Sequence, residues 1–203
     1  MWVRVPLPAP GRCKNVTWLS ILLGYLLGSF PTAYLAGHIV AGKDIRRMGD
    51  ENMGAANAYR TLGPAAGLGV FFIDVAKGAL AVFLAQKLTD SQVSVILTGA
   101  AAVAGHNWPF FLGFRGGRGE STAIGVLLVV YTIPTLVMAL PAILTLAISR
   151  NVILTSAVLF VPLSLIGYVI HLPGLLIGYS IGLPCLVGLT HYLRTRKQPA
   201  TGH

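Results

Sequence analysis

The sequence predicts an all-α protein embedded in a membrane, with seven transmembrane helices or six. Apolar residues make up 55% of its 203 residues, and charged residues make up only 10%. Soluble domains carry roughly 25% charged residues. The mean hydropathy is +0.74, and apolar runs of about 20 residues, long enough to cross the hydrocarbon core as helices, follow one another along the chain.

A single membrane-embedded domain over residues 1–203 is expected, because the spans leave no room for a soluble domain. Residues 1–15 are expected to form an N-terminal segment outside the membrane, and residues 192–203 a basic C-terminal tail. The first apolar run has the length of a full span and lacks an Ala-x-Ala-like cleavage site. It is therefore interpreted as a retained helix rather than a signal peptide.

Six apolar runs are the candidate spans. They cover residues 16–40, 67–85, 93–112, 122–148, 152–170 and 174–190. Ser29 and Pro31 predict a kink in the first run. The fourth run contains Pro134 and Pro141, and its length fits either one tilted helix or two short helices broken near Pro134. Two short helices give seven spans, and one helix gives six.

The distribution of basic residues favours seven spans with the N-terminus outside, because Lys and Arg near span ends favour the cytoplasmic side. In that topology the inside holds Lys43, Arg46, Arg47, Arg60, Arg115, Arg118, Arg150, Arg194, Arg196 and Lys197. With six spans the basic tail moves to the side opposite the first two polar loops. We therefore expect a multi-pass protein of the plasma membrane whose polar loops face the cytoplasm.

The net charge of +9 predicts anionic partners at the bilayer surface. Nucleic acid is not expected, because the basic residues lie in short stretches between apolar runs rather than on an aromatic-rich soluble face. Lipid headgroups and phosphorylated substrates fit better. Cys13 and Cys185 lie far apart and have no metal-binding or redox spacing.

The first polar loop has the composition of an anion-binding segment. Asn52 and Asn57 can donate side-chain amide hydrogens, and Gly54 lets backbone amides approach a ligand. Arg60 can hold a phosphate with two parallel hydrogen bonds. A solvated connector rich in positive charge is the alternative interpretation.

The second polar loop, between the third and fourth apolar runs, is rich in glycine. Gly116, Gly117 and Gly119 permit backbone angles that turn amide hydrogens towards one anion. Ser121 and Thr122 open the next helix, whose positive end favours phosphate. The spacing of a Walker loop is absent, and a tight connection between two helices is the alternative.

Several ionisable side chains lie near these loops. His106, beside Asn107, can exchange a proton or bind phosphate, although histidines of this kind are more often hydrogen-bonded structural residues. Asp74 and Lys77 share one helix face, so Lys77 is expected to line a polar cavity with Asp74 as its counterion. A purely structural ion pair is the alternative. His191 ends the last run, either as a site residue or as part of a basic topology anchor.

In this order and spacing the motifs resemble those of the bacterial membrane glycerol-3-phosphate acyltransferases that use acyl phosphate as donor, the PlsY type. The resemblance covers nearly the whole chain. The motifs that carry it are Gly28-Ser-Phe-Pro-Thr-Ala-Tyr-Leu35, Lys43-Asp-Ile-Arg46, Gly49 with Asn52 to Arg60, Asp74 with Lys77-Gly78, and Gly105-His-Asn-Trp-Pro through Gly119.

The resemblance implies a seven-helix enzyme that transfers a fatty acyl group from acyl phosphate to the 1-hydroxyl of sn-glycerol 3-phosphate, giving lysophosphatidic acid in phospholipid synthesis. It requires neither a metal nor another cofactor. His106, Arg118 and His191 are the candidate catalytic residues. The candidate substrate-binding residues are Arg46, Asn52, Gly54, Asn57, Arg60, Lys77, Asn107, Gly116, Gly117, Gly119, Ser121 and Thr122.

Several residues inside the motifs differ from the family pattern, and Asp50, Ala56, Glu120 and Arg194 among them bear on the activity. They leave open an alternative in which the chain is a catalytically weak or inactive paralogue that binds lipid phosphates. A small transporter of a phosphorylated solute would use the same cations, and it is the third interpretation.

Overall fold

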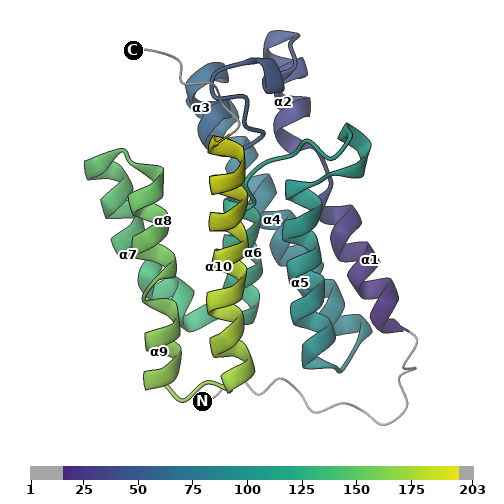
Figure 1. Cartoon of the computed structure of the whole chain (residues 1–203), viewed down its shortest axis with the longest axis vertical. Coiled ribbons are helices and arrows are strands. Elements are labelled where there is room, and N and C mark those ends of the chain that lie inside the picture. Colours follow the sequence, from purple (N-terminus) through teal and green to yellow (C-terminus); the bar gives the residue numbers. More distant parts are fainter. Residues whose placement is uncertain (1–15, 197–203) are drawn as a thin grey trace.

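The structure is a computed structural model that describes residues 16–196. This part of the chain is a helical bundle (Figure 1). Its elements are α1 (Val16–Gly28), α2 (Thr32–Ala41), the 3-10 helix η1 (Ile45–Arg47), α3 (Ala55–Leu62), α4 (Pro64–Leu88), α5 (Gln92–Asn107), the 3-10 helix η2 (Phe110–Leu112), α6 (Glu120–Val130), α7 (Thr132–Ser149), α8 (Val152–Phe160), α9 (Leu163–Val169) and α10 (Gly174–Thr195).

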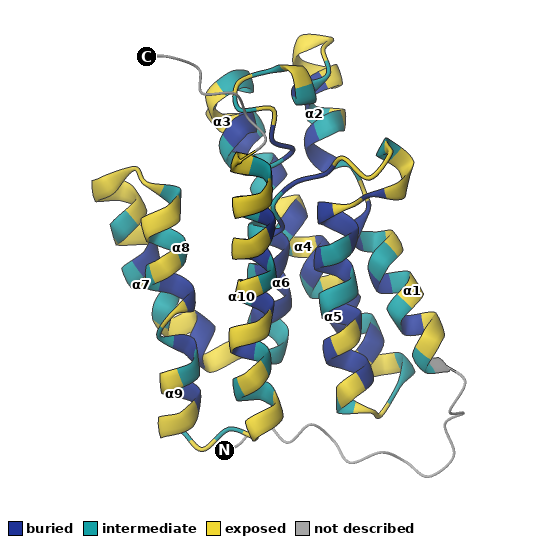
Figure 2. Ribbon diagram, in the orientation of Figure 1, coloured by how far each residue is buried: buried dark blue, intermediate teal, exposed yellow. Residues whose placement is uncertain are grey.

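Six helical segments among the described residues are long and apolar enough to cross a membrane. They are Thr17–Ala41, Pro64–Leu88, Gln92–Leu112, Thr132–Ser149, Val152–Val169 and Gly174–Thr195. Large apolar side chains are exposed along the outward helix faces, including Trp18 at 78% and Ile148 at 84% (Figure 2). Such a surface suits lipid rather than water.

The predicted interruption of the first run is confirmed. The first helix, α1, ends at Gly28, where the Ser29 hydroxyl donates to the carbonyl oxygen of Tyr25 at 2.7 Å. Pro31 has no backbone N–H and cannot continue the hydrogen-bond ladder. The chain resumes as α2 at Thr32, so one apolar run becomes two helices with a short polar break between them.

The fourth run forms two helices, which was one of the two predicted alternatives. The break lies at Tyr131, because a helix continued through Pro134 would lose the hydrogen bond to Val130 and place the ring against that carbonyl. In α7, Pro134 instead occupies the first turn, where no N–H is needed. The eleven residues of α6 pack closely on α4 at Gly125, where a Cβ atom would overlap the Val75 carbonyl oxygen.

Three boundaries differ from the prediction. The first polar loop contains α3, an amphipathic helix that hydropathy alone does not reveal. The fifth run is broken into α8 and α9 at Pro162, which has no N–H to donate. In α10 the helix continues to Thr195, so the predicted tail from residue 192 begins as helix. Residues 1–15 and 197–203 lie outside the described part.

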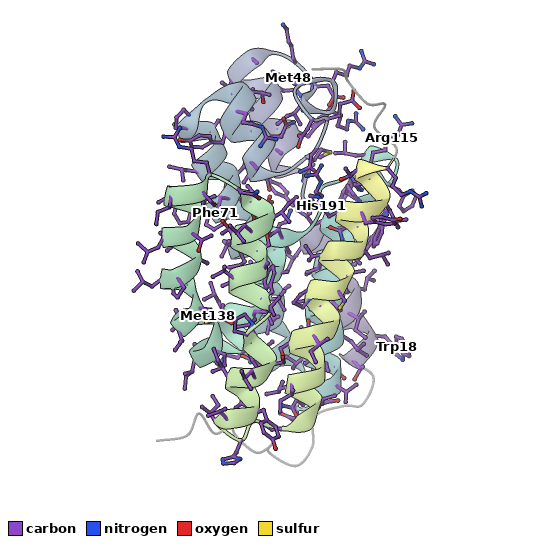
Figure 3. The ribbon with its side chains drawn as sticks, turned by 60° about the vertical axis from the view of Figure 1, so that its left-hand side comes forward. Trp18, Met48, Phe71, Arg115, Met138 and His191 are labelled. Carbon is purple, nitrogen blue, oxygen red and sulfur yellow. The ribbon has the colours of Figure 1, made fainter. Side chains whose placement is uncertain are left out.

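The two polar loops lie at the same end of the bundle, here called the polar end, which carries η1, α3 and η2 (Figure 1). A small apolar core fastens the first loop to α2 and α4. Its buried residues are Ala33, Ile45, Met53, Ala58 and Val70. Met48, Arg115 and His191 lie at this end, whereas Trp18 lies near the opposite end (Figure 3).

Candidate active site

Three basic residues from three separate elements meet at the polar end around the carboxylate of Asp50. Arg60 of α3 donates to Asp50 Oδ2 at 2.9 Å. Arg118, in the glycine-rich loop before α6, has Nη2 at 3.7 Å from the same oxygen. His191 of α10 interacts electrostatically with both Arg118 and Asp50. The structure therefore brings together three of the predicted site residues.

The first loop is folded around the side chain of Asn57, which is fully buried. Its amide nitrogen donates to the carbonyl oxygens of Met48 at 3.0 Å and Asn52 at 2.9 Å, and its oxygen accepts from the N–H of Asp50 at 3.2 Å. These three bonds hold the loop in shape, so Asn57 positions the site rather than reaching for a ligand. The buried side-chain oxygen of Asn52 has no partner within the described residues.

The glycine-rich loop folds back on the end of α5. Gly116 donates its N–H to the Asn107 carbonyl at 3.2 Å, and Gly117 donates to the His106 carbonyl at 3.0 Å. At Gly117 a Cβ atom would overlap the His106 ring, and Gly119 adopts a φ of 83°. Two of the amides expected to face an anion are thus already paired with protein.

The first turn of α6 offers the amides that the glycine loop does not. The N–H groups of Glu120, Ser121 and Thr122 have no helical carbonyl partner, because they begin the helix. Arg118 lies immediately before them. The positive end of α6 and the Arg118 guanidinium together form the anion-binding part of this loop.

Sequence reasoning missed the role of Arg194, which fastens α10 to the loop. Its guanidinium donates to the carbonyl oxygens of Gly116 and Asn107. The amide nitrogen of Asn107, which is fully buried, donates to the Thr190 hydroxyl at 3.1 Å. The position of Arg194 in a basic cluster predicted only a topology anchor. The spacing along the chain does not reveal which carbonyl groups α10 contacts.

Three further ionisable residues, Asp74, Lys77 and His106, are buried close together. Lys77 Nζ is 2.8 Å from Asp74 Oδ1 and donates to the Phe30 carbonyl at 3.1 Å. His106 Nδ1 lies 3.7 Å from the same Asp74 oxygen. These residues line a small cavity together with Gly117. The expectation that Lys77 faces a polar cavity with Asp74 as its counterion agrees with this geometry.

An open apolar groove of about 890 Å³ adjoins this cavity. Phe30 and Lys77 line both the groove and the cavity. The remaining lining side chains come from α1, α4 and α6 and are apolar. They are Leu23, Leu26, Leu27, Ile73, Ala76, Ala79, Leu80, Phe83 and Val129. Such a groove fits a long alkyl chain whose polar end reaches Lys77.

Arg46 lies apart from the cluster. It contacts both carboxylate oxygens of Asp44 at 2.7 to 3.0 Å, and it donates to the Leu112 carbonyl at 3.2 Å. The hydrogen bond from Arg46 lowers the pKa of Asp44. These contacts join the first loop to η2. A substrate-binding role for Arg46 stays a prediction.

Buried polar atoms without a protein partner gather around the same loops. Among the described residues they include Thr32 Oγ1, Asn52 Oδ1, Asn107 Oδ1, Arg118 Nε and Thr122 Oγ1. Buried polar groups are nearly always hydrogen-bonded in folded proteins. Phosphate oxygens could accept from Arg118 Nε and the two threonine hydroxyls, whereas the two asparagine oxygens need a donor, such as a hydroxyl group of the ligand.

Comparisons with known proteins agree with this arrangement. A sequence model of the family described as "Glycerol-3-phosphate acyltransferase" matches residues 18–198. The chain is 55% identical over 179 residues to "Glycerol-3-phosphate acyltransferase 4" of Dehalococcoides mccartyi, covering 88% of this chain and 97% of that relative. It is 40% identical over 139 residues to a glycerol-3-phosphate acyltransferase of Shouchella clausii, covering 68% of each.

Solved structures show the same fold. The crystal structure of PlsY (YgiH), an integral membrane glycerol 3-phosphate acyltransferase, in its glycerol 3-phosphate form is 30% identical, with a TM-score of 0.78. The match covers 89% of this chain and 90% of that chain. Its lysophosphatidic acid form matches with a TM-score of 0.72. The predicted all-α, multi-pass membrane fold is confirmed, and the chain belongs to the glycerol-3-phosphate acyltransferase family.

Proposed function

We propose that this protein transfers a fatty acyl group from acyl phosphate to the 1-hydroxyl of sn-glycerol 3-phosphate, giving lysophosphatidic acid and inorganic phosphate. The observation that carries the proposal is the meeting of two unlike features. An apolar groove and a small cavity with polar residues in its lining share Lys77, and the cavity is also lined by Gly117, the residue next to Arg118. A phosphorylated acceptor needs the cations of the polar end. An acyl phosphate needs a polar site for its phosphate and an apolar groove for its acyl chain.

The acceptor phosphate is assigned to the cationic cluster, which consists of Arg60, Arg118 and His191. Arg60 and Arg118 can each donate two parallel hydrogen bonds to phosphate oxygens. His191 lies at the same end of the bundle and would donate a third. Asn52, with its unpaired buried oxygen, can accept a hydrogen bond from a glycerol hydroxyl and so orient the acceptor.

The donor is assigned to the groove and to the start of α6. Its acyl chain would lie among the apolar side chains, whose burial contributes about 0.8 kcal/mol per CH₂ group. Its phosphate would meet the first-turn amides of Ser121 and Thr122, where the helix end favours negative charge. Lys77 lines both the groove and the cavity, so it would lie near the point where the acyl chain of the donor joins the phosphate.

The reaction follows by direct attack. The acceptor hydroxyl oxygen forms a bond to the acyl carbon, the bond from that carbon to the phosphate oxygen breaks, and inorganic phosphate leaves with the bonding electron pair. The hydroxyl proton passes to the leaving phosphate. The first-turn amides of α6 stabilise the negative charge that develops at the carbonyl oxygen and on the leaving phosphate. His106 and His191 are the candidates for orienting the acceptor hydroxyl and the leaving phosphate.

The polar end is assigned to the cytoplasmic side, because basic residues near span ends favour that side. The first two polar loops and Arg194 lie at this end, whereas Lys87 lies in the last turn of α4, at the opposite end. Single cysteines in place of Arg150 and Lys87, in a variant without its native cysteines, test the assignment. In intact cells an impermeant maleimide should label residue 87 and spare residue 150, and the reverse pattern would contradict it.

The activity is tested with purified protein in detergent, given acyl phosphate with and without glycerol 3-phosphate. We expect acceptor-dependent formation of lysophosphatidic acid with release of phosphate. Arg118→Ala should lower the rate by about 100-fold or more, the magnitude typical of losing one charge-stabilising donor. Arg115→Ala, an exposed arginine of the same loop, should keep it. No acceptor-dependent product from folded protein would favour the inactive-paralogue alternative.

A further inference from the structure

We propose that Asp50 determines the specificity of the acceptor site by acting as an internal competitor for the acceptor phosphate. Its carboxylate occupies the anion position between Arg60 and Arg118, and the ligand must displace it to bind. This inference rests on the proposed function, because it concerns the same site and the same acceptor.

The carboxylate is held in this position by its own loop. Asp50 Oδ1 accepts the N–H of Asn52 at 3.3 Å, which leaves Oδ2 facing both arginines. That oxygen is 2.9 Å from Arg60 Nη2 and 3.7 Å from Arg118 Nη2. The N–H of Asp50 is in turn fixed by the buried side chain of Asn57. The position of the carboxylate is therefore built into the fold of the loop.

The strength of the contact permits exchange. The side chains of Asp50, Arg60 and Arg118 are 27%, 52% and 20% exposed, so water screens both pairs. Ion pairs of this kind are weak. A phosphate ester near pH 7 carries more negative charge than a carboxylate and has three acceptor oxygens. It can therefore take over both arginines, whereas a neutral or singly charged ligand gains too little.

Two consequences follow for the acceptor site. When no acceptor is bound, the carboxylate keeps two neighbouring guanidinium groups from repelling each other. When a ligand arrives, the cost of displacing the carboxylate is subtracted from its affinity. The site then favours ligands with a doubly charged phosphate over ligands with one charge or none, at the expense of weaker binding overall.

Steady-state kinetics with three variants test the proposal. Asp50→Asn keeps the shape and removes the charge, and we expect the KM for glycerol 3-phosphate to fall about threefold to tenfold. Asp50→Glu keeps a competing charge and should stay nearer the wild type. Glu51→Gln removes the same charge one residue away, from a side chain outside the described ion pairs, and should change KM less than about twofold. An unchanged or higher KM in Asp50→Asn would overturn the proposal.

A binding measurement separates this inference from the proposed function. Thermal unfolding of the detergent-purified protein is followed with increasing glycerol 3-phosphate or inorganic phosphate, without any acyl donor. Asp50→Asn should reach half of its maximal stabilisation at a concentration several-fold lower than wild type. If wild type makes no lysophosphatidic acid but this shift occurs, the function fails and the competitor stands. If acyl transfer occurs without the shift, the competitor fails and the function stands.

Discussion

The interior helix α5 and the peripheral helices α7 to α9 are all apolar enough to cross a membrane, but they differ in how much of their surface the protein buries. In an 18-residue window of each span, 56% of the residues are buried in Gln92–Leu112, which contains α5, compared with 17% in α7 and 22% across α8 and α9. The C-terminal end of α5 carries His106 and Asn107, and both are buried among polar partners. A helix surrounded by protein can hold polar groups that a lipid-facing helix cannot, because the bilayer core offers them no partners.

The two regions are nevertheless connected. Glu120, in the first turn of α6, has its carboxyl oxygen 2.5 Å from the hydroxyl of Ser156 on α8. Ser156 also lies 2.8 Å from the carbonyl oxygen of Val152. This contact joins the peripheral hairpin to the helix end that is proposed to hold the donor phosphate. The contribution of the Glu120–Ser156 contact to stability can be compared with that of the buried pair Asp74 and Lys77.

The largest effect is expected from breaking the buried ion pair. Lys77→Met leaves the carboxylate of Asp74 buried without its partner, which typically costs about 3–5 kcal/mol of stability. Arg150→Met, an exposed change between α7 and α8, should stay within about 0.5 kcal/mol. Unfolding in detergent, followed by tryptophan fluorescence, measures both. A double variant, Asp74→Leu with Lys77→Met, should recover part of the loss, and equal losses in single and double variants would argue against a pair.

A smaller loss is expected from a methyl group in the glycine loop. Gly117→Ala places a Cβ atom against the His106 ring, which must displace the loop that carries Arg118. Displacements of about 1 Å at a catalytic centre can lower rates about 100-fold. Gly178→Ala on α10 is the control, because a Cβ atom there meets open space, and it should leave the rate unchanged. Initial rates at saturating substrates compare them, and similar rates would show that the loop tolerates movement.

The groove gives a prediction about the acyl chain. Ala76→Trp fills part of the groove on α4, so transfer of a 16-carbon acyl group should fall about tenfold relative to an 8-carbon group, because several CH₂ contacts are lost. Ala147→Trp on the exposed face of α7 is the matched control. The ratio of the two rates is the readout. A ratio that Ala76→Trp leaves unchanged would place the acyl chain elsewhere.

The smallest effect is expected at the contact between the two regions. Ser156→Ala removes the hydroxyl partner of Glu120 and should cost about 0.5–1.5 kcal/mol, the range for one hydrogen bond. The KM for acyl phosphate should rise several-fold if the contact positions α6. Thr155→Val removes a neighbouring hydroxyl that donates to the carbonyl oxygen of Asn151, at the start of α8, and it should leave KM unchanged. Equal effects of the two changes would show that the hairpin does not position α6.

Much of the fold could be predicted from the sequence, because spans depend on local hydropathy. The breaks at Pro31 and Pro134 were also predictable, since each proline removes a donor from the helix ladder. The break at Pro162 carries the same local signal, but it was missed within a long apolar run. The helix α3 was missed because only one face of it is apolar, so its average composition is that of a polar loop.

The site was predictable where a residue type alone suggests its role. Arg60 was assigned from its chemistry, Arg118 and His191 were assigned through the family resemblance, and all three lie at the polar end. Asp50 and Arg194 were not, because their contacts join segments distant in sequence. Asn57 illustrates the opposite limit. An amide suited to binding a ligand is equally suited to holding a loop, and only the fold decides between the two.

The most direct test of the account compares two acceptors, glycerol 3-phosphate and glycerol, with wild type and Arg60→Ala. If the cations at the polar end recognise the acceptor phosphate, wild type should strongly prefer glycerol 3-phosphate by kcat/KM. Arg60→Ala should then lose about tenfold to 100-fold with glycerol 3-phosphate, the range for losing hydrogen bonds to a charged group, and lose little with glycerol. Equal proportional losses with the two acceptors would contradict the assignment of this cluster to the acceptor phosphate.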